Sequence, residues 1–290
     1  RPVAQVPRSK TAIGEPPVIK GITAYLRRHP GTTAAAVLVI SFIILIALAG
    51  PITRYDPLEQ RIDQRLQPPS SVHLFGTDGF GRDVFSRVLH GGRVTLYVAL
   101  FSVVAACLIG IPTGTYMAYS GGLPDLLIGR IIDTLLGFPF IVLAIIVVVA
   151  FQPSPTVVAV AIAAVFIPRI TVVSRTAASL VKQEPYIHAA NAIGAKPARI
   201  IFLHMLPNSI APSVSQAIGY IGGAVATESI LSYLGLGVPP PYPSWGRMIQ
   251  EGTSLYFEAA PWLVIFPGVA LFLVVVCFSL LAEEMKSALS

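Results

Sequence analysis

The chain has 290 residues, of which 54% are hydrophobic and only 12% charged, and its mean hydropathy is +0.74. A soluble globular protein carries about 25% charged residues, so this composition excludes that class, and a chain this apolar is not disordered either. The net charge of +6 would suggest nucleic-acid binding in a soluble protein, but basic loops on the cytoplasmic side of a bilayer explain it here, and no nucleic-acid partner is expected. The sequence therefore predicts an all-α protein that crosses the lipid bilayer several times.

Six stretches of the chain are apolar and long enough to cross about 30 Å of hydrocarbon, which takes about 20 residues. Charges mark their limits, because none occurs between Arg28 and Arg54, for example. The uncharged gap from Asp133 to Arg169 is too long for one helix, and the Gln-Pro-Ser-Pro segment at 152–155 divides it. The sequence predicts a cytoplasmic tail with an interfacial helix over residues 1–31, then a transmembrane domain over 32–290 with spans at about 32–52, 95–118, 131–151, 156–178, 209–233 and 259–282.

The lysines and arginines predict the orientation, because such residues are enriched in cytoplasmic loops. With the N-terminus inside, the inside segments carry 13 basic and 6 acidic residues, and the outside segments carry 7 basic and 8 acidic ones. Both termini are therefore expected in the cytoplasm. Two connections are longer than a turn requires, one outside at 53–93 and one inside at about 178–208, and function usually lies in such loops.

The predicted spans contain few groups that could carry chemistry. Asp133, Arg169, Arg175 and Glu228 all fall near predicted span ends, where we expect interfacial anchors, and this disfavours a proton- or ion-driven secondary transporter. The sequence has no phosphate loop, no H-E-x-x-H and no G-x-S-x-G motif, and its five histidines lack helical spacing. We therefore expect no catalytic, cofactor-binding or metal-binding residue on this chain.

The inner loop 184–208 is predicted to form two short helices joined by a tight turn. Pro185 suits the first turn of one helix and Pro197 the first turn of the next, because neither position needs its N–H. Gly194 stands where the residue that ends a helix needs a positive φ. Pro207 is expected to close the second helix before the fifth span. One exposed face of the first helix would carry Tyr186, Ala189, Ala190 and Ile193.

This loop resembles the EAA loop of bacterial ABC importer permeases, in which E-A-A, three residues and a glycine precede a hydrophobic stretch that ends in L-P. The matching residues are Ala189, Ala190, Gly194, Leu206 and Pro207. The sequence departs from the pattern at His188, where the family usually has glutamate, and at His204. Segment 75–93 resembles the G-T-D-x-x-G-R-D-x-x-S-R signature of the oligopeptide and dipeptide permease C-type subunits, and segments 234–246 and 266–270 are also similar to that branch.

The resemblance implies a type I ABC importer permease fold with six transmembrane helices, in the bacterial plasma membrane. It implies half of a translocation pathway for peptides, completed by a homologous B-type permease and supplied by an extracytoplasmic peptide-binding protein. ATP and Mg²⁺ would bind to separate ATPase subunits. Their surface groove would receive the coupling loop, for which the resemblance and the loop pattern single out Glu184, Tyr186, His188, Ala189, Ala190, Gly194, Leu206 and Pro207.

The outer side offers weaker candidates for a gate or a contact with the binding protein. Asp78, Arg82, Asp83 and Arg87 have the spacing of a salt-bridged outer helix, although a solvated interfacial helix would look the same. Trp245 is expected in an outer aromatic belt, and Glu228 has either a pathway role or simple interfacial solvation. Two alternative functions stay open at this stage: a permease for nickel or another small solute, and an ATP-independent secondary transporter.

Overall fold

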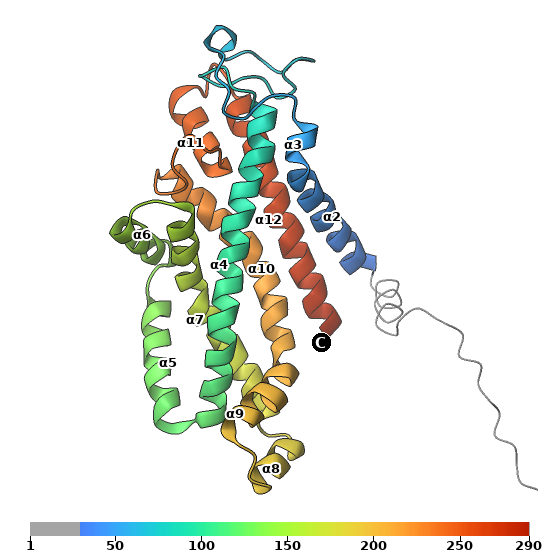
Figure 1. The fold of residues 1–290 in the computed structure, drawn as a ribbon, viewed down its shortest axis with the longest axis vertical. Helices are drawn as coiled ribbons and strands as arrows, with labels where there is room; N and C mark the ends of the chain where they lie inside the picture. The colour runs from blue at the N-terminus through green and yellow to red at the C-terminus, as the bar shows by residue number, and fades with distance from the viewer. Residues whose placement is uncertain (1–29, 290) are drawn as a thin grey trace, which may run out of the picture.

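The computed structural model describes residues 30–289, and this part of the chain is almost entirely helical, with a single β-type bridge between Thr77 and Asp83. Figure 1 shows an elongated molecule in which α4, α7, α10 and α12 run along the long axis. We call the end that carries α11 the upper end and the end that carries α8 and α9 the lower end. The helices are α2 (Pro30–Ala47), α3 (Ala49–Ile52), η1 (Ile62–Gln64), α4 (Val84–Ser120), α5 (Gly122–Gly137), α6 (Phe140–Phe151), α7 (Pro155–Val181), α8 (Pro185–Ala192), α9 (Pro197–Arg199), η2 (Ile200–Met205), α10 (Leu206–Tyr233), α11 (Trp245–Leu255) and α12 (Trp262–Leu289).

Three helices of the described residues are long and apolar enough to cross a membrane, namely α4, α7 and the segment Trp262–Lys286 of α12. The bent pair α5 and α6 counts as a fourth crossing if it is taken as one span. The six predicted spans therefore remain a prediction. The interfacial helix predicted within residues 1–31 falls almost wholly outside the described residues.

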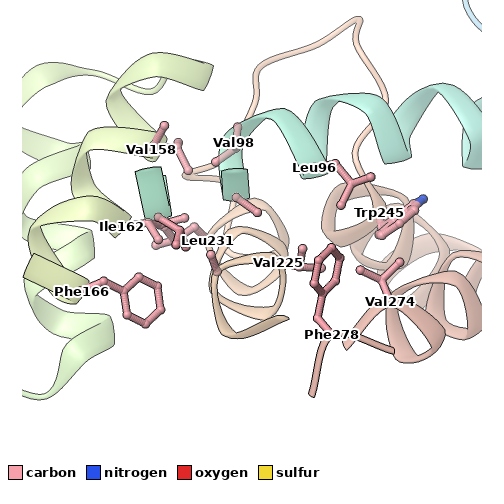
Figure 2. Packing of buried hydrophobic residues seen from close by; sticks show 14 of the residues in the cluster. Leu96, Val98, Val158, Ile162, Phe166, Val225, Leu231, Trp245, Val274 and Phe278 are labelled. Carbon is pink, nitrogen blue, oxygen red and sulfur yellow. The ribbon is translucent and has the colours of Figure 1, made fainter. Parts of the chain in front are cut away.

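The core lies around α10, which packs against α4, α7 and α12. Figure 2 shows α10 between α7 and α12, with Ile162 and Phe166 on one side and Phe278 on the other. Because protein surrounds α10, its buried face can be polar, and it carries buried serines such as Ser209 and Ser213. Such a helix does not need the apolar character of one that faces lipid.

The predicted third span, 131–151, is wrong as a single straight helix. The structure has two helices there, α5 and α6, which meet at an angle of 95° (Figure 1). Pro139 explains the break, because a proline disfavours the helical conformation of the residue before it. Phe138 is accordingly extended, with φ −80° and ψ 140°, and α5 ends at Gly137.

The predicted outer segment 53–93 is not a loop throughout, because its last part is helical and α4 already begins at Val84. Asp83 starts the helix by accepting a hydrogen bond from the Ser86 N–H at 2.8 Å, a typical N-cap. Charged residues near the start of α4 have partners that the sequence pattern did not reveal. Arg93, for instance, donates from Nε to the Ile46 carbonyl oxygen at 3.0 Å and so caps the end of α2.

The inner loop also differs from the prediction, because its second helix does not end at Pro207. The segments α9, η2 and α10 follow one another without a gap, and Pro207 lies in the first turn of α10. Residues Ile200–Met205 have π-helical hydrogen bonding, so the ladder is already irregular where the proline lacks its N–H. The inner loop is thus attached to α10 through continuous helix.

Arg169, which was predicted near the end of a span, lies in the middle of a helix. It follows Pro155 by 14 residues and precedes Val181 by 12, so it occupies the middle of α7 and not its end. At about 1.5 Å of rise per residue, Arg169 is about 20 Å from the first residue of the helix. This places a cation near the middle of a predicted membrane crossing.

Candidate functional site

The inner loop is anchored to the lower ends of α4 and α7 by a small apolar cluster. Ile187 and Ala190 of α8 are buried in it, together with Ile200 and Met205. Lys182, at the end of α7, joins that helix to the end of α4, because its Nζ donates to the carbonyl oxygens of Ala118 and Tyr119, both at 2.9 Å. Movement of α8 would therefore be transmitted to three of the long helices, α4, α7 and α10.

The turn between α8 and α9 is built around Gly194, which has φ +76° as predicted. The Ala195 N–H donates to the Ala190 carbonyl oxygen at 3.1 Å, and the Gly194 N–H donates to the Asn191 carbonyl oxygen at 3.0 Å. This pair of bonds is a Schellman motif, which needs a left-handed residue at the position of Gly194. A Cβ on Gly194 would meet nothing within 4 Å, so the backbone conformation alone demands glycine.

The free face of α8 differs from the predicted one in one residue. Ala190 is buried and helps to anchor the helix, whereas Tyr186, His188 and Ala189 are exposed. Ile193 at the tip is 85% exposed, which is unusual for so large an apolar side chain. Of the remaining predicted loop residues, Glu184 and Pro207 are exposed and Leu206 is partly buried.

At the upper end, five charged residues form a network of ion pairs that we call the upper ion cluster. Three of its members are buried, and Arg247 and Glu251 are partly exposed. The Asp78 carboxylate accepts from Arg82 Nε at 2.6 Å and lies 3.4 Å from Arg87 Nε. Glu251 of α11 lies 3.4 Å from Arg82 Nη2 and 2.9 Å from Arg247 Nε. The Arg87 side chain is only 2% exposed, so its charge depends on these partners. The cluster fixes the loop before α4, the first turn of α4 and α11 to one another.

The predicted outer helix of alternating charges is therefore wrong, although Asp78 and Arg82 do form an ion pair. Asp78, Arg82 and Asp83 precede α4, and they are buried and not solvated. Asp83 also lies apart from the upper ion cluster, because its Oδ1 accepts from His73 Nδ1 at 2.9 Å. Sequence analysis missed Arg247 and Glu251, whose only signal is a four-residue spacing in a short helix.

Glu228 and Trp245 are both buried, which corrects the predicted interfacial positions. The Glu228 carboxylate accepts hydrogen bonds from Thr95 Oγ1 at 2.9 Å and from Ser232 Oγ at 2.6 Å. Trp245 is 1% exposed and donates from Nε1 to the Val88 carbonyl oxygen at 2.8 Å. Both residues join α4 to a neighbouring helix and so act as structural contacts at the upper end. Within residues 30–289, no group of three or more His, Cys, Asp and Glu side chains is placed to hold a metal ion.

Residues 110–286 match the family described as the binding-protein-dependent transport system inner membrane component. The chain belongs to this family. As a member of the binding-protein-dependent permease family, it is a multi-pass inner-membrane component of a transport system.

Several relatives of this permease are described as peptide transport proteins. The dipeptide transport system permease protein DppC of Alkalihalophilus pseudofirmus is 38% identical over 91% of this chain and 86% of its own length. The glutathione transport system permease protein GsiD of Pectobacterium atrosepticum is 38% identical over 91% of this chain and 88% of its own length. A solved structure of the MetNI methionine ABC transporter superposes with a TM-score of 0.54 and 17% identity over 70% of this chain and 96% of that chain, which shows a shared fold.

Proposed function

We propose that this permease is the C-type membrane subunit of an ATP-driven ABC importer for peptides. It would form half of the translocation pathway, and a homologous B-type permease would form the other half. An extracytoplasmic binding protein would deliver oligo- or dipeptides to it. Relatives at 38% identity that are described as dipeptide and glutathione permeases support the peptide cargo.

The inner loop would couple this subunit to the ATPase. The observation that carries this part is the exposed Ile193 and Ala189 on a helix whose opposite face is packed under α4 and α7. Such a helix offers an apolar surface to a partner while its anchor transmits the partner's movement. Under this proposal ATP and Mg²⁺ bind to the ATPase subunits, and this chain needs no cofactor of its own.

The orientation proposed from the basic residues places the inner loop and both termini in the cytoplasm, with six spans between the two faces. Ser70 at the upper end and Ala198 at the lower end are both exposed and test it. A cysteine at position 70 should react with an impermeant thiol reagent in intact cells, and one at position 198 only after the membrane is opened. The reverse labelling would contradict the proposed orientation.

The function is tested by reconstituting this chain with the B-type permease, the ATPase subunits and the binding protein in liposomes. We expect uptake of a labelled peptide that requires ATP and the loaded binding protein. Uptake that persists without the ATPase subunits would instead indicate a secondary transporter. Binding of nickel but not of peptides by the delivering protein would favour the small-solute alternative.

A further inference from the structure

Arg169 is a charged residue in the middle of α7 whose surroundings differ from those of the other charged side chains described above. Its guanidinium lies 5.7 Å from the ring centre of Phe140 and 5.8 Å from that of Phe166. Tyr220 of α10 stacks on Phe166, with ring centres 4.8 Å apart. Three helices, α6, α7 and α10, therefore contribute aromatic rings beside one half-buried cation.

No carboxylate within residues 30–289 forms an ion pair with Arg169, whose guanidinium lies instead beside the rings of Phe140 and Phe166. The same helix shows the contrast, because Arg175 pairs with Asp125 of α5 at 2.5 Å. A cation at mid-membrane depth is costly unless it faces the protein interior or a water-filled space and finds an anion. Cation–π contacts offset part of this cost but leave the hydrogen-bond donors of the guanidinium unused.

The break between α5 and α6 lies beside Arg169, because Phe140 is the first residue of α6. The peptide groups at 138 and 139 are outside any helix at this depth, and Pro139 provides no side-chain cap for α6. Non-helical backbone at membrane depth is tolerated only where protein buries it or where it lines a water-filled cavity. Phe138, Pro139 and Phe140 are exposed in this chain, so a water-filled space or a partner subunit would have to shield this break from lipid.

We propose that Arg169 binds the C-terminal carboxylate of the transported peptide as the peptide passes the break between α5 and α6. This inference rests on the proposed peptide cargo. An importer that accepts peptides of different sequence can recognise only the groups that all of them share, and the terminal carboxylate is the one obligatory anion among these. A guanidinium binds a carboxylate through two parallel hydrogen bonds, and the rings of Phe140 and Phe166 would hold it in place.

The experiment compares uptake of one peptide as the free acid and as its C-terminal amide by the complete reconstituted transporter. The affinity of the binding protein for both peptides is measured first, and both are supplied at saturating concentration. The variants are Arg169→Gln, Arg169→Lys and the control Arg175→Gln, which removes a charge that has its own partner. The ratio of the two uptakes is independent of the amount of assembled transporter, so a partly unstable variant still gives an answer.

We expect Arg169→Gln to lower uptake of the free acid about tenfold and uptake of the amide less than about twofold, since only the acid can form the charged hydrogen bonds. Arg169→Lys should keep part of the preference, and Arg175→Gln should leave the ratio unchanged. An equal fall for both peptides would mean that Arg169 pairs with the companion permease, and it would overturn the assignment, as would no change for either. Failure of the unmodified transporter to take up either peptide would overturn the proposed function instead.

Discussion

The two ends of the molecule differ in their most unusual residues, which are buried and charged at the upper end and exposed and apolar at the lower end. At the upper end, Asp78, Arg82 and Arg87 are buried and satisfy one another with the help of Glu251. At the lower end, α8 contains no acidic or basic side chain other than His188, and Ile193, the residue that follows it, is exposed. A closed network of charges holds an architecture together, whereas an exposed apolar tip on an anchored helix is suited to a partner. Substitutions at the upper end should therefore affect stability, and those at the lower end should affect coupling.

The largest effect is expected for Asp78→Leu, which leaves Arg82 and Arg87 buried with only Glu251 to balance them. The carboxylate of Asp78 also accepts from the backbone N–H groups of Phe80 and Arg82, at 2.9 and 3.0 Å. Removing one partner of a buried ion pair costs about 3–5 kcal/mol. We expect a large drop in the thermal unfolding midpoint of the purified protein in detergent.

Glu59→Leu is the matched control for that substitution. Glu59 pairs with Arg61 at 2.9 Å, but both side chains are more than one third exposed. Exposed pairs contribute below about 1 kcal/mol, so the unfolding midpoint should barely change. Equal midpoints for the Asp78 and Glu59 variants would show that the upper ion cluster does not hold this end together.

The second prediction concerns coupling and uses Gly194→Val. A side chain at φ +76° costs about 1–2 kcal/mol of backbone strain, and the new side chain would project from the proposed docking surface. Peptide uptake by the reconstituted transporter should fall at least about tenfold, and the ATPase should lose its stimulation by loaded binding protein. The variant should still co-purify with the B-type permease, because the long helices are unchanged.

Gly235 offers a control with the same backbone conformation at the upper end. Its φ is +79°, and a Cβ there would also meet nothing within 4 Å. Gly235→Val should therefore carry similar strain and keep uptake within about twofold of the unmodified protein. If both variants lose uptake equally, strain and not the site of coupling explains the result for Gly194.

The smallest effects are expected on the exposed surface of the inner loop itself. Ala189→Asp adds a charge to the proposed docking face and should lower uptake by about fivefold without a change in unfolding midpoint. Lys196→Gln, on an exposed residue of the same turn, should change uptake by less than about twofold. Equal uptake by both variants would mean that the face with Ala189 does not meet a partner.

Features set by neighbouring residues could be predicted from the sequence. Gly194 has the predicted positive φ, and Pro185 and Pro197 lie in the first turns of the predicted helices α8 and α9. These outcomes follow from the steric limits of proline and glycine, which hold wherever the residue is placed. The break at Pro139 also follows from the steric limits of proline. It was not predicted, because the third span was placed by the length of an uncharged stretch alone.

Tertiary structure alone decided which polar residues are buried and with what partners. Arg87, Glu228 and Trp245 looked like interfacial residues, and each is buried because a helix distant in sequence covers it. Arg169 occurs in an ordinary-looking stretch, and only the packing of α6 and α10 against α7 gives it aromatic neighbours and no anion within residues 30–289. Composition and local sterics determine that this chain is a helical membrane protein with a turn at Gly194. The partners of a charge depend on contacts between distant segments, which no local pattern encodes.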